Sequence, residues 1–175
     1  MRYYFAVEVQ ANGAMTMKPA LPILVMSAGV AIAMLPTGAA AGPLDEARAA
    51  TETEDYPAAL ALLQPLADQG NAEAQSTLGF FYANGYGVAL DYERAVFWYT
   101  RAADQSYALA QGSLGFHYEY GLGVERDLLR SYVWYSLALA RATGALRDLF
   151  ARDQERVIAR MTPDQIAEAR LIARE

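Results

Sequence analysis

An internal repeat of 36 residues constrains this chain more than any other feature of its sequence. Residues 69–103 and 105–139 align without a gap, and 16 of the 35 aligned positions are identical. The identical positions include glycines, aromatic residues and an aspartate at constant spacing: Gln75/Gln111, Leu78/Leu114, Gly79/Gly115, Phe80/Phe116, Tyr82/Tyr118, Gly85/Gly121, Gly87/Gly123, Asp91/Asp127 and Trp98/Trp134. A period in the thirties with this spacing is typical of a helical solenoid, in which each unit packs on its neighbours.

Each copy of the repeat predicts two helices joined by a glycine turn. Leu78, Gly79 and Tyr82 fall on one face of the first helix. A glycine inside a helix costs about 1 kcal/mol relative to alanine, so its repetition predicts a neighbouring helix that passes too close for a β-carbon. Gly85 is placed to end the first helix in the left-handed conformation, and the aspartate six residues later is placed to cap the second helix.

These residues resemble the Sel1-like repeat (SLR) family, a relative of the tetratricopeptide repeats. The resemblance covers roughly residues 55–142, and it is weaker in the second copy at Ser106, Ser131 and Leu139. It implies an all-α fold: a short α-solenoid of helix-turn-helix repeats in a right-handed superhelix, here with about seven helices. It also implies that the solenoid holds other proteins, and it implies no reaction. The family pattern is matched at Ala74, Leu78, Gly79, Tyr82, Gly85, Gly87, Val88, Asp91, Ala95, Trp98, Ala102 and Ala103.

Partial units are expected on both sides of the two copies, because the ends of a solenoid must be covered. Asp55 aligns with the capping aspartate of a second helix, and Thr162 with Gln165 predicts a capping box for a closing helix. Residues 144–160 continue in the register of a third first helix. The expected divisions are a leader (1–41), a linker or short capping turn (42–54), a half-repeat helix (55–70), repeat one (71–106), repeat two (107–143), and a degenerate half-repeat with a capping helix (144–175).

The leader resembles a secretory signal peptide. Lys18 precedes a largely apolar run at 21–35, and three alanines at 39–41 form a small-residue cleavage pattern. As a helix this run spans about 22 Å, less than the roughly 30 Å of a bilayer core. We expect translation from Met17, cleavage after Ala41 (with Ala39 as a second candidate) and a periplasmic or secreted protein. An uncleaved membrane anchor is the alternative.

The charge balance disfavours nucleic acid and anionic membrane surfaces as partners. Removing residues 1–41 takes away Arg2, Lys18 and Glu8, which leaves 12 basic and 19 acidic side chains in 134 residues, a net charge of −7. All twelve basic residues are arginines. Binding to nucleic acid relies on clustered cations, which this composition does not provide.

Residues able to carry chemistry are few. The single histidine, His117, replaces Phe81 of the first copy, so a packing or interface role is expected. Ser113 lies four residues before His117 and is able to touch it along one helix face, but no nucleophile motif surrounds this serine. The chain has no cysteine, and residues 42–175 have no lysine. We therefore expect no catalytic residue, no metal site, no cofactor and no enzyme activity.

A partner is expected on the concave face, which the first helix of each pair lines in tetratricopeptide-like stacks. The aromatic residues Phe80, Phe116 and Tyr120 are predicted to form an apolar anchor, with Glu73 and Glu119 on its rim. The alternative is that both phenylalanines only pack between helices. By the same spacing, the side chains not used for packing are Glu73, Ser76, Phe80, Ala83 and Asn84 in the first copy and Leu109, Gly112, Phe116, Glu119 and Tyr120 in the second. All of them except Ala83 and Gly112 form the predicted partner-binding set.

Three functions remain in competition. The leading one is an exported, non-enzymatic scaffold or adaptor of the cell envelope that binds a peptide or helix of another protein. The second is a structural subunit that stacks through its end helices into an assembly. The third is an enzyme directed at the cell wall, which the absence of a nucleophile–base pair disfavours.

Overall fold

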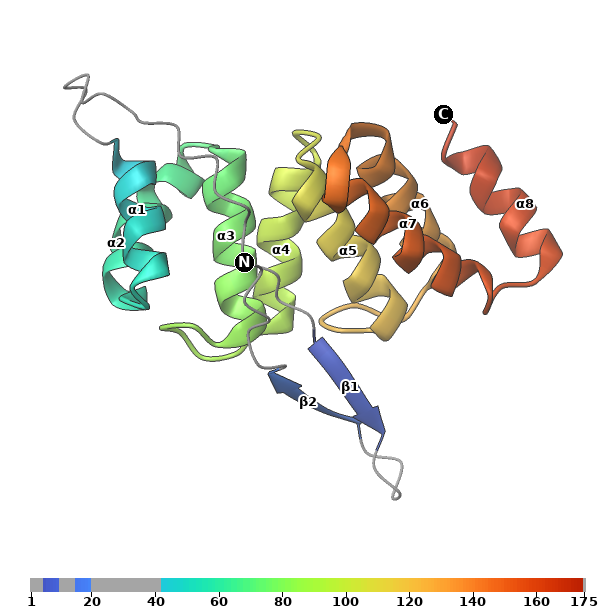
Figure 1. Ribbon diagram of the computed structural model, residues 1–175, viewed down its shortest axis with the longest axis horizontal. Coiled ribbons are helices and arrows are strands. Elements are labelled where there is room, and N and C mark those ends of the chain that lie inside the picture. Colours follow the sequence, from blue (N-terminus) through green and yellow to red (C-terminus); the bar gives the residue numbers. More distant parts are fainter. Residues whose placement is uncertain (1–4, 10–14, 20–41, 175) are drawn as a thin grey trace. The chain divides into compact units, whose positions relative to one another are not determined.

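The computed structural model describes residues 5–9, 15–19 and 42–174, and the chain divides into two units, Met1–Ala39 and Ala40–Glu175. In the first unit, strands β1 (Phe5–Val9) and β2 (Met15–Pro19) pair antiparallel, with Val7 opposite Met17 (Figure 1). The predicted start at Met17 thus falls within β2. The apolar run and the cleavage site of the predicted leader lie outside the described residues.

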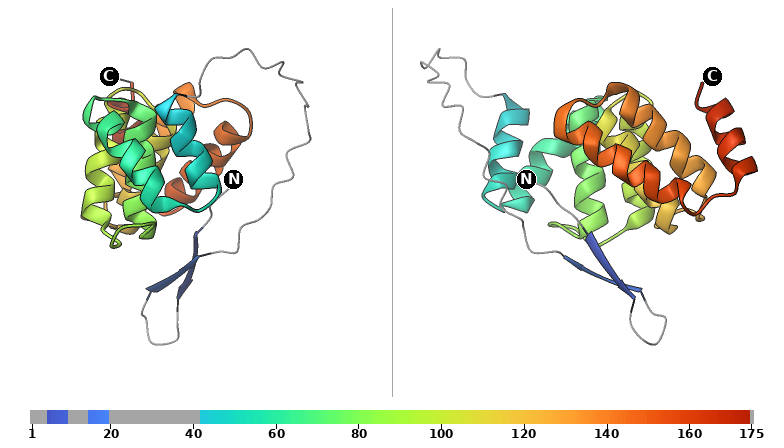
Figure 2. Two further views of the ribbon diagram at one scale, coloured as in Figure 1. Left: turned by 90° about the vertical axis from the view of Figure 1, so that its left-hand side faces the viewer. Right: turned by 45° about the vertical axis from the view of Figure 1, so that its right-hand side comes forward.

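The second unit is all-helical over residues 42–174, as the repeat predicts. Among the described residues, no helix is both long and apolar enough to span a membrane. Consecutive helices from α1 to α7 pack on one another, and α8 packs on α6 (Figures 1 and 2). The helices are α1 (Pro43–Glu52), α2 (Tyr56–Asp68), α3 (Ala72–Asn84), α4 (Tyr92–Ala103), α5 (Ala108–Tyr120), α6 (Leu128–Arg141), α7 (Gly144–Ile158) and α8 (Pro163–Ile172).

This second unit has eight helices in its described part, one more than expected, because α1 forms where only a short capping turn was predicted. Pro43 stands at the first helical position and the Asp45 carboxylate accepts a hydrogen bond from the Gly42 amide, both of which favour a helix start. Ala47 is buried against α2 and α3. It lies 36 residues before Ala83, which is also buried, so α1 occupies the place of a first helix.

The hydrophobic core repeats with the sequence. One cluster contains Ala59, Ala74, Leu78 and Trp98, and the residues 36 positions later form or contact the next cluster. Trp134 packs on that second cluster at the position that Trp98 takes in the first, but Trp98 is buried and Trp134 only half-buried. The third cluster extends the series: Phe150 of α7 takes the position that Leu114 takes in α5.

The predicted helix ends are confirmed. The Asp91 carboxylate accepts a hydrogen bond from the Arg94 amide at 2.9 Å, and Asp127 does the same for the amide three residues on. Gly85 and Gly121 end their helices at φ +70°. At the start of α8, the Thr162 hydroxyl and the Gln165 side chain form the predicted capping box. Local sequence therefore sets the boundaries of these helices.

The glycine inside each first helix makes room for a tyrosine ring. A β-carbon on Gly79 would lie 2.7 Å from the Tyr99 ring of α4, and one on Gly115 would lie 2.9 Å from the Tyr135 ring of α6. Real side chains do not approach so closely. The predicted close approach is therefore confirmed, and its physical reason is a buried aromatic ring of the second helix.

A hydrogen bond that the sequence did not predict ties each second helix to the following first helix. Gln75 donates from its side chain to the carbonyl of Ala67, and Gln111 donates to the carbonyl of Ala103. At the next equivalent position, the Arg147 guanidinium donates to the carbonyl of Leu139. Three successive junctions thus use the same bond with an eight-residue separation. This bond sets α7 in the register of a third first helix.

Candidate functional site

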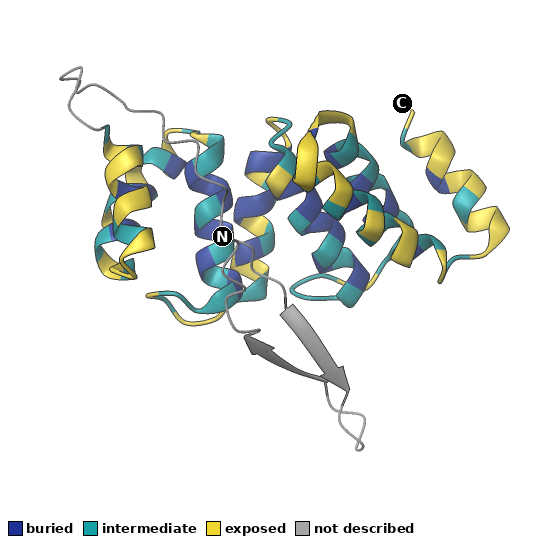
Figure 3. Ribbon diagram, in the orientation of Figure 1, coloured by how far each residue is buried: buried dark blue, intermediate teal, exposed yellow. Residues whose placement is uncertain are grey.

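The candidate site is the surface that α3, α5 and α7 present to solvent, here called the first-helix face. It is defined by four positions on α3 and their equivalents 36 and 72 residues later. All twelve side chains at these positions are partly or fully exposed (Figure 3). They are Glu73, Thr77, Phe80 and Asn84 on α3, Leu109, Ser113, Phe116 and Tyr120 on α5, and Ala145, Leu149, Arg152 and Arg156 on α7.

Six of the eight predicted partner-binding residues lie on this face. Leu109 is the most exposed of them, at 45%. The Asn84 side-chain amide donates to the carbonyl of Phe80 at 2.7 Å, so it also stabilises the end of α3. Glu73 is held by an arginine of α1, as described below. The others on the face are Phe80, Phe116 and Tyr120.

The predictions that placed Ser76 and Glu119 at this surface are wrong. Ser76 is 8% exposed and Glu119 is fully buried. Ala83 and Gly112, which the same spacing argument placed at the surface, are also buried. A β-carbon on Gly112 would overlap the Phe150 ring of α7, because that ring packs directly on the α5 backbone. These positions face the first helix of the next repeat. Helical periodicity within a single helix does not show where that neighbouring helix packs.

The aromatic residues of the face form two groups instead of one continuous anchor. The Phe80 ring contacts Tyr86, with centroids 5.5 Å apart, and the Phe116 ring contacts Tyr120 at 4.7 Å. Both phenylalanines are partly buried: Phe80 packs on the first two core clusters and Phe116 on the third. Each ring therefore contributes to packing and also reaches the solvent-exposed face.

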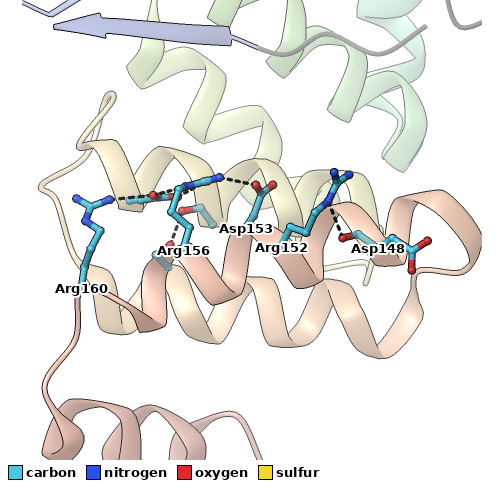
Figure 4. Close-up of polar contacts among 8 residues, drawn as sticks. Asp148, Arg152, Asp153, Arg156 and Arg160 are labelled. Carbon is cyan, nitrogen blue, oxygen red and sulfur yellow. Dashed lines mark hydrogen bonds and ion pairs between the residues drawn. The ribbon is translucent and has the colours of Figure 1, made fainter.

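Glu119 is the buried centre of an ion-pair cluster between α5 and α7, whose two arginines are partly exposed. Arg156 binds both of its carboxylate oxygens, at 2.8 and 2.7 Å, and Arg160 donates to one of them at 2.9 Å. Arg156 also pairs with Asp153 at 2.7 Å, and its guanidinium lies over the Tyr120 ring (Figure 4). The hydrogen bonds that Arg156 donates to Glu119 raise the pKa of Arg156, while burial raises the pKa of Asp153. Two cations and extensive hydrogen bonding thus compensate a fully buried carboxylate.

A second arginine–glutamate pair joins α1 to α3. Arg48 donates to the two carboxylate oxygens of Glu73, both at 2.7 Å, and to Asp45 of its own helix at 3.0 Å. The Glu73 side chain remains 33% exposed, and that of Arg48 53% exposed. The hydrogen bond to Glu73 raises the pKa of Arg48.

His117 is a buried packing residue. It is 3% exposed, and its ring makes edge contacts with Tyr92, Tyr99 and Phe116. Nδ1 lies 2.8 Å from the carbonyl oxygen of Leu122, so this nitrogen carries the proton and donates it. Burial lowers the pKa of His117 to about 4, which keeps the ring neutral near pH 7.

Ser113 makes no nucleophile–base pair with this histidine. Its hydroxyl donates to the carbonyl of Leu109 at 2.9 Å, one turn back along α5. A hydrogen bond between the Ser113 and Tyr99 side chains partly offsets the rise that burial causes in the pKa of Tyr99. The part of the chain that the structure describes contains no group of three or more residues able to hold a metal ion. The arrangement supports recognition by surface contacts.

Sequence reasoning missed six residues of the face, which are Thr77, Ser113, Ala145, Leu149, Arg152 and Arg156. The signal for the two arginines was present, because continuing the 36-residue period from Phe116 and Tyr120 leads to them. The period was not carried into α7 because that helix lacks the repeated glycines. Thr77 was missed because Ser76 was assigned to the surface in its place.

Comparisons with known proteins agree with this architecture. A structure of a protective antigen from uropathogenic Escherichia coli strains, displaying an SLR fold, superposes with a TM-score of 0.67 at 27% identity, over 75% of this chain and 29% of that chain. A Sel1 repeat protein from Oxalobacter formigenes superposes with a TM-score of 0.55 at 32% identity, over 58% of this chain and 40% of that chain. The present chain therefore spans well under half the length of either protein. A search of curated proteins gave no significant match.

The family model for the Sel1 repeat matches three consecutive segments, residues 51–71, 72–107 and 108–142, which together make up just over half of the chain. The matched segments begin at the end of α1 and run through α6, and the second and third coincide with the helix pairs α3/α4 and α5/α6. The chain belongs to the Sel1 repeat family.

Proposed function

We propose that this protein is an exported, non-enzymatic scaffold of the cell envelope that binds a segment of another protein on its first-helix face. Proteins built from Sel1 repeats are generally scaffolds for protein–protein interaction, and their solenoid fold is typically non-enzymatic. The signal-peptide pattern of residues 1–41 supports export.

The observation that carries the proposal is the row of side chains on α5. Leu109, Phe116 and Tyr120 reach solvent along one side of a single helix, while the opposite side of α5 is buried. Exposed apolar and aromatic side chains on a rigid scaffold are the usual carriers of binding energy at interfaces. The α5 helix is packed on both sides, by α4 and α6, so its outward side chains are held in place before any partner binds.

A second function has its own observation. Leu171 and Ile172 of α8 are 63% and 40% exposed, which gives the last helix an apolar strip of its own. This strip favours a structural subunit that associates through its C-terminal helix. The two functions use different surfaces, so one pair of variants separates them.

The test compares Leu109→Glu with Leu171→Glu. Both remove an exposed leucine and add one negative charge, and neither side chain is in the core, so both variants should keep the wild-type unfolding midpoint. Partners are captured in the native compartment by in-cell crosslinking. Loss of the crosslinked protein with Leu109→Glu but not with Leu171→Glu supports binding on the first-helix face. The opposite result, with a reduced molar mass by light scattering, supports the structural subunit.

Export is tested separately by cell fractionation and N-terminal sequencing. A mature protein that begins at Gly42 outside the cytoplasm is the expected result. A cytoplasmic protein that retains residues 17–41 would overturn the exported part of the proposal and leave the interaction surface untouched.

A further inference from the structure

Arg152 differs from Arg156 and Arg160 in how its charge is used. Arg156 and Arg160 bind the buried Glu119, and Arg147 donates to the carbonyl of Leu139. Arg152 is exposed, and its Nε donates to the backbone carbonyl of Asp148 at 3.3 Å. Within residues 42–174 it forms no ion pair with a carboxylate. Figure 4 shows its guanidinium extending to the same side of α7 as that of Arg156.

The repeat register places this arginine in a row with two aromatic residues. Phe80 on α3, Phe116 on α5 and Arg152 on α7 are separated by 36 residues each and occupy equivalent positions of three successive first helices. The helices α5 and α7 are in direct contact, since the Phe150 ring packs against Gly112. A cation available to a ligand thus lies one helix away from the Phe116–Tyr120 pair.

We infer that the protein segment bound on the first-helix face carries an acidic side chain that pairs with Arg152, next to an apolar side chain that packs on Phe116 and Tyr120. This inference rests on the proposed function. Arginine presents a planar array of donors that matches a carboxylate, and a neighbouring apolar contact makes the pair directional. The negative net charge of the chain, −6, disfavours a polyanion such as nucleic acid as the source of the negative group.

The geometry also sets the spacing of the two side chains in the ligand. Packed helices lie about 8–10 Å apart, and an extended peptide advances about 3.3 Å per residue. A peptide that crosses from α5 to α7 therefore places its aspartate or glutamate about three residues from its apolar anchor.

The experiment selects peptides from a phage-displayed library of random dodecapeptides on the full chain. The wild-type protein is compared with Arg152→Glu and with Arg126→Glu, a matched charge change at an exposed loop residue away from the face. We expect wild type and Arg126→Glu to enrich an acidic residue about three positions from a leucine, isoleucine or aromatic residue. Arg152→Glu should instead enrich a lysine or arginine at that position.

The best wild-type peptide is then synthesised with an amidated C-terminus, so that only side chains carry negative charge, and titrated by fluorescence anisotropy. We expect Arg152→Glu to weaken its Kd at least tenfold and Arg126→Glu to change it less than twofold. Replacing the acidic residue of the peptide by lysine should restore binding to Arg152→Glu.

Two results overturn the inference, and they have different meanings. In the first result, the selected peptides bind wild type and Arg152→Glu equally well, and Leu109→Glu abolishes their binding. This result would reject the role of Arg152 and leave the proposed function standing. A library that yields no peptide dependent on the first-helix face would reject both. Circular dichroism melting of each variant checks that the folded state is intact.

Discussion

An arginine–glutamate pair stabilises each end of the row of first helices, but the two pairs lie in different environments. Arg48 binds Glu73 at the N-terminal end and Arg156 binds Glu119 at the C-terminal end, both through two hydrogen bonds. Glu73 is one-third exposed, whereas Glu119 is fully buried and occupies the position that Ala83 has in the first copy. When an exposed pair is broken, both side chains form hydrogen bonds with water instead. A buried carboxylate that loses its partners has no water to replace their hydrogen bonds.

This difference shows that equal geometry does not mean equal contribution to stability. The N-terminal pair orients α1 on a junction that apolar contacts already close. The C-terminal junction has replaced an alanine with a charge, so its integrity depends on Arg156 and Arg160. We expect the α5–α7 junction to be the one most sensitive to substitution of an arginine.

The largest expected effect comes from breaking the buried pair. Arg156→Met should destabilise the fold by about 3 kcal/mol, at the low end for a buried charge that loses a partner, because Arg160 still donates to Glu119. Arg48→Met should barely move the midpoint of urea denaturation. The double variant Glu119→Ala/Arg156→Met restores the alanine of the first copy and should lie within about 1 kcal/mol of wild type. Equal losses for Arg48→Met and Arg156→Met would show that burial does not separate the two pairs.

An effect of similar size distinguishes the two copies at low pH. His117 has a folded-state pKa of about 4 against an ordinary value of 6.5, whereas the equivalent Phe81 does not titrate. Between these two values the unfolded state binds more protons, so stability is complete above pH 6.5 and falls as the pH decreases toward 4. The expected loss from this residue is roughly 3 kcal/mol.

The measurement for this second prediction is urea denaturation of wild type and His117→Phe at pH 7, 5.5 and 4.5. Carboxylates titrate in both proteins, so the difference between the two curves isolates the histidine. His117→Phe should lose clearly less stability than wild type on acidification. Parallel curves would mean that the buried ring does not resist protonation.

The smallest expected effect has opposite signs in the two copies. Tyr99 and Tyr135 are equivalent and buried, but Tyr99 has a hydrogen bond to Ser113, whereas the Tyr135 hydroxyl has no partner among the described residues. The position equivalent to Ser113 in the next unit is Leu149. Tyr99→Phe should cost about 1 kcal/mol, and Tyr135→Phe should be neutral or stabilise by up to about 1 kcal/mol. Chemical denaturation of the two variants checks the signs, and destabilisation by both would contradict the comparison.

Most of the fold was predictable because its determinants are local and repeated. The glycines at 85 and 121 and the aspartates at 91 and 127 set helix ends that depend only on neighbouring backbone groups. Helix α1 was underestimated because its core contact is a single alanine, Ala47, with no glycine or aromatic residue to mark the period. The candidate site was predictable only in part. Helical periodicity placed Phe80, Phe116 and Leu109 correctly, but it does not state which side of a helix the next unit covers.

The sequence by itself determined that the chain is a stack of helix pairs with a period of 36, where the helices of the two full repeats start and end, and which aromatic residues recur in the core. These properties follow from backbone conformation and spacing along one or two helices. Only the tertiary structure decided which side chains of the first helices stay exposed, and that Glu119 is buried beneath two arginines. These properties depend on contacts between helices of different units, which the residues of a single helix do not encode.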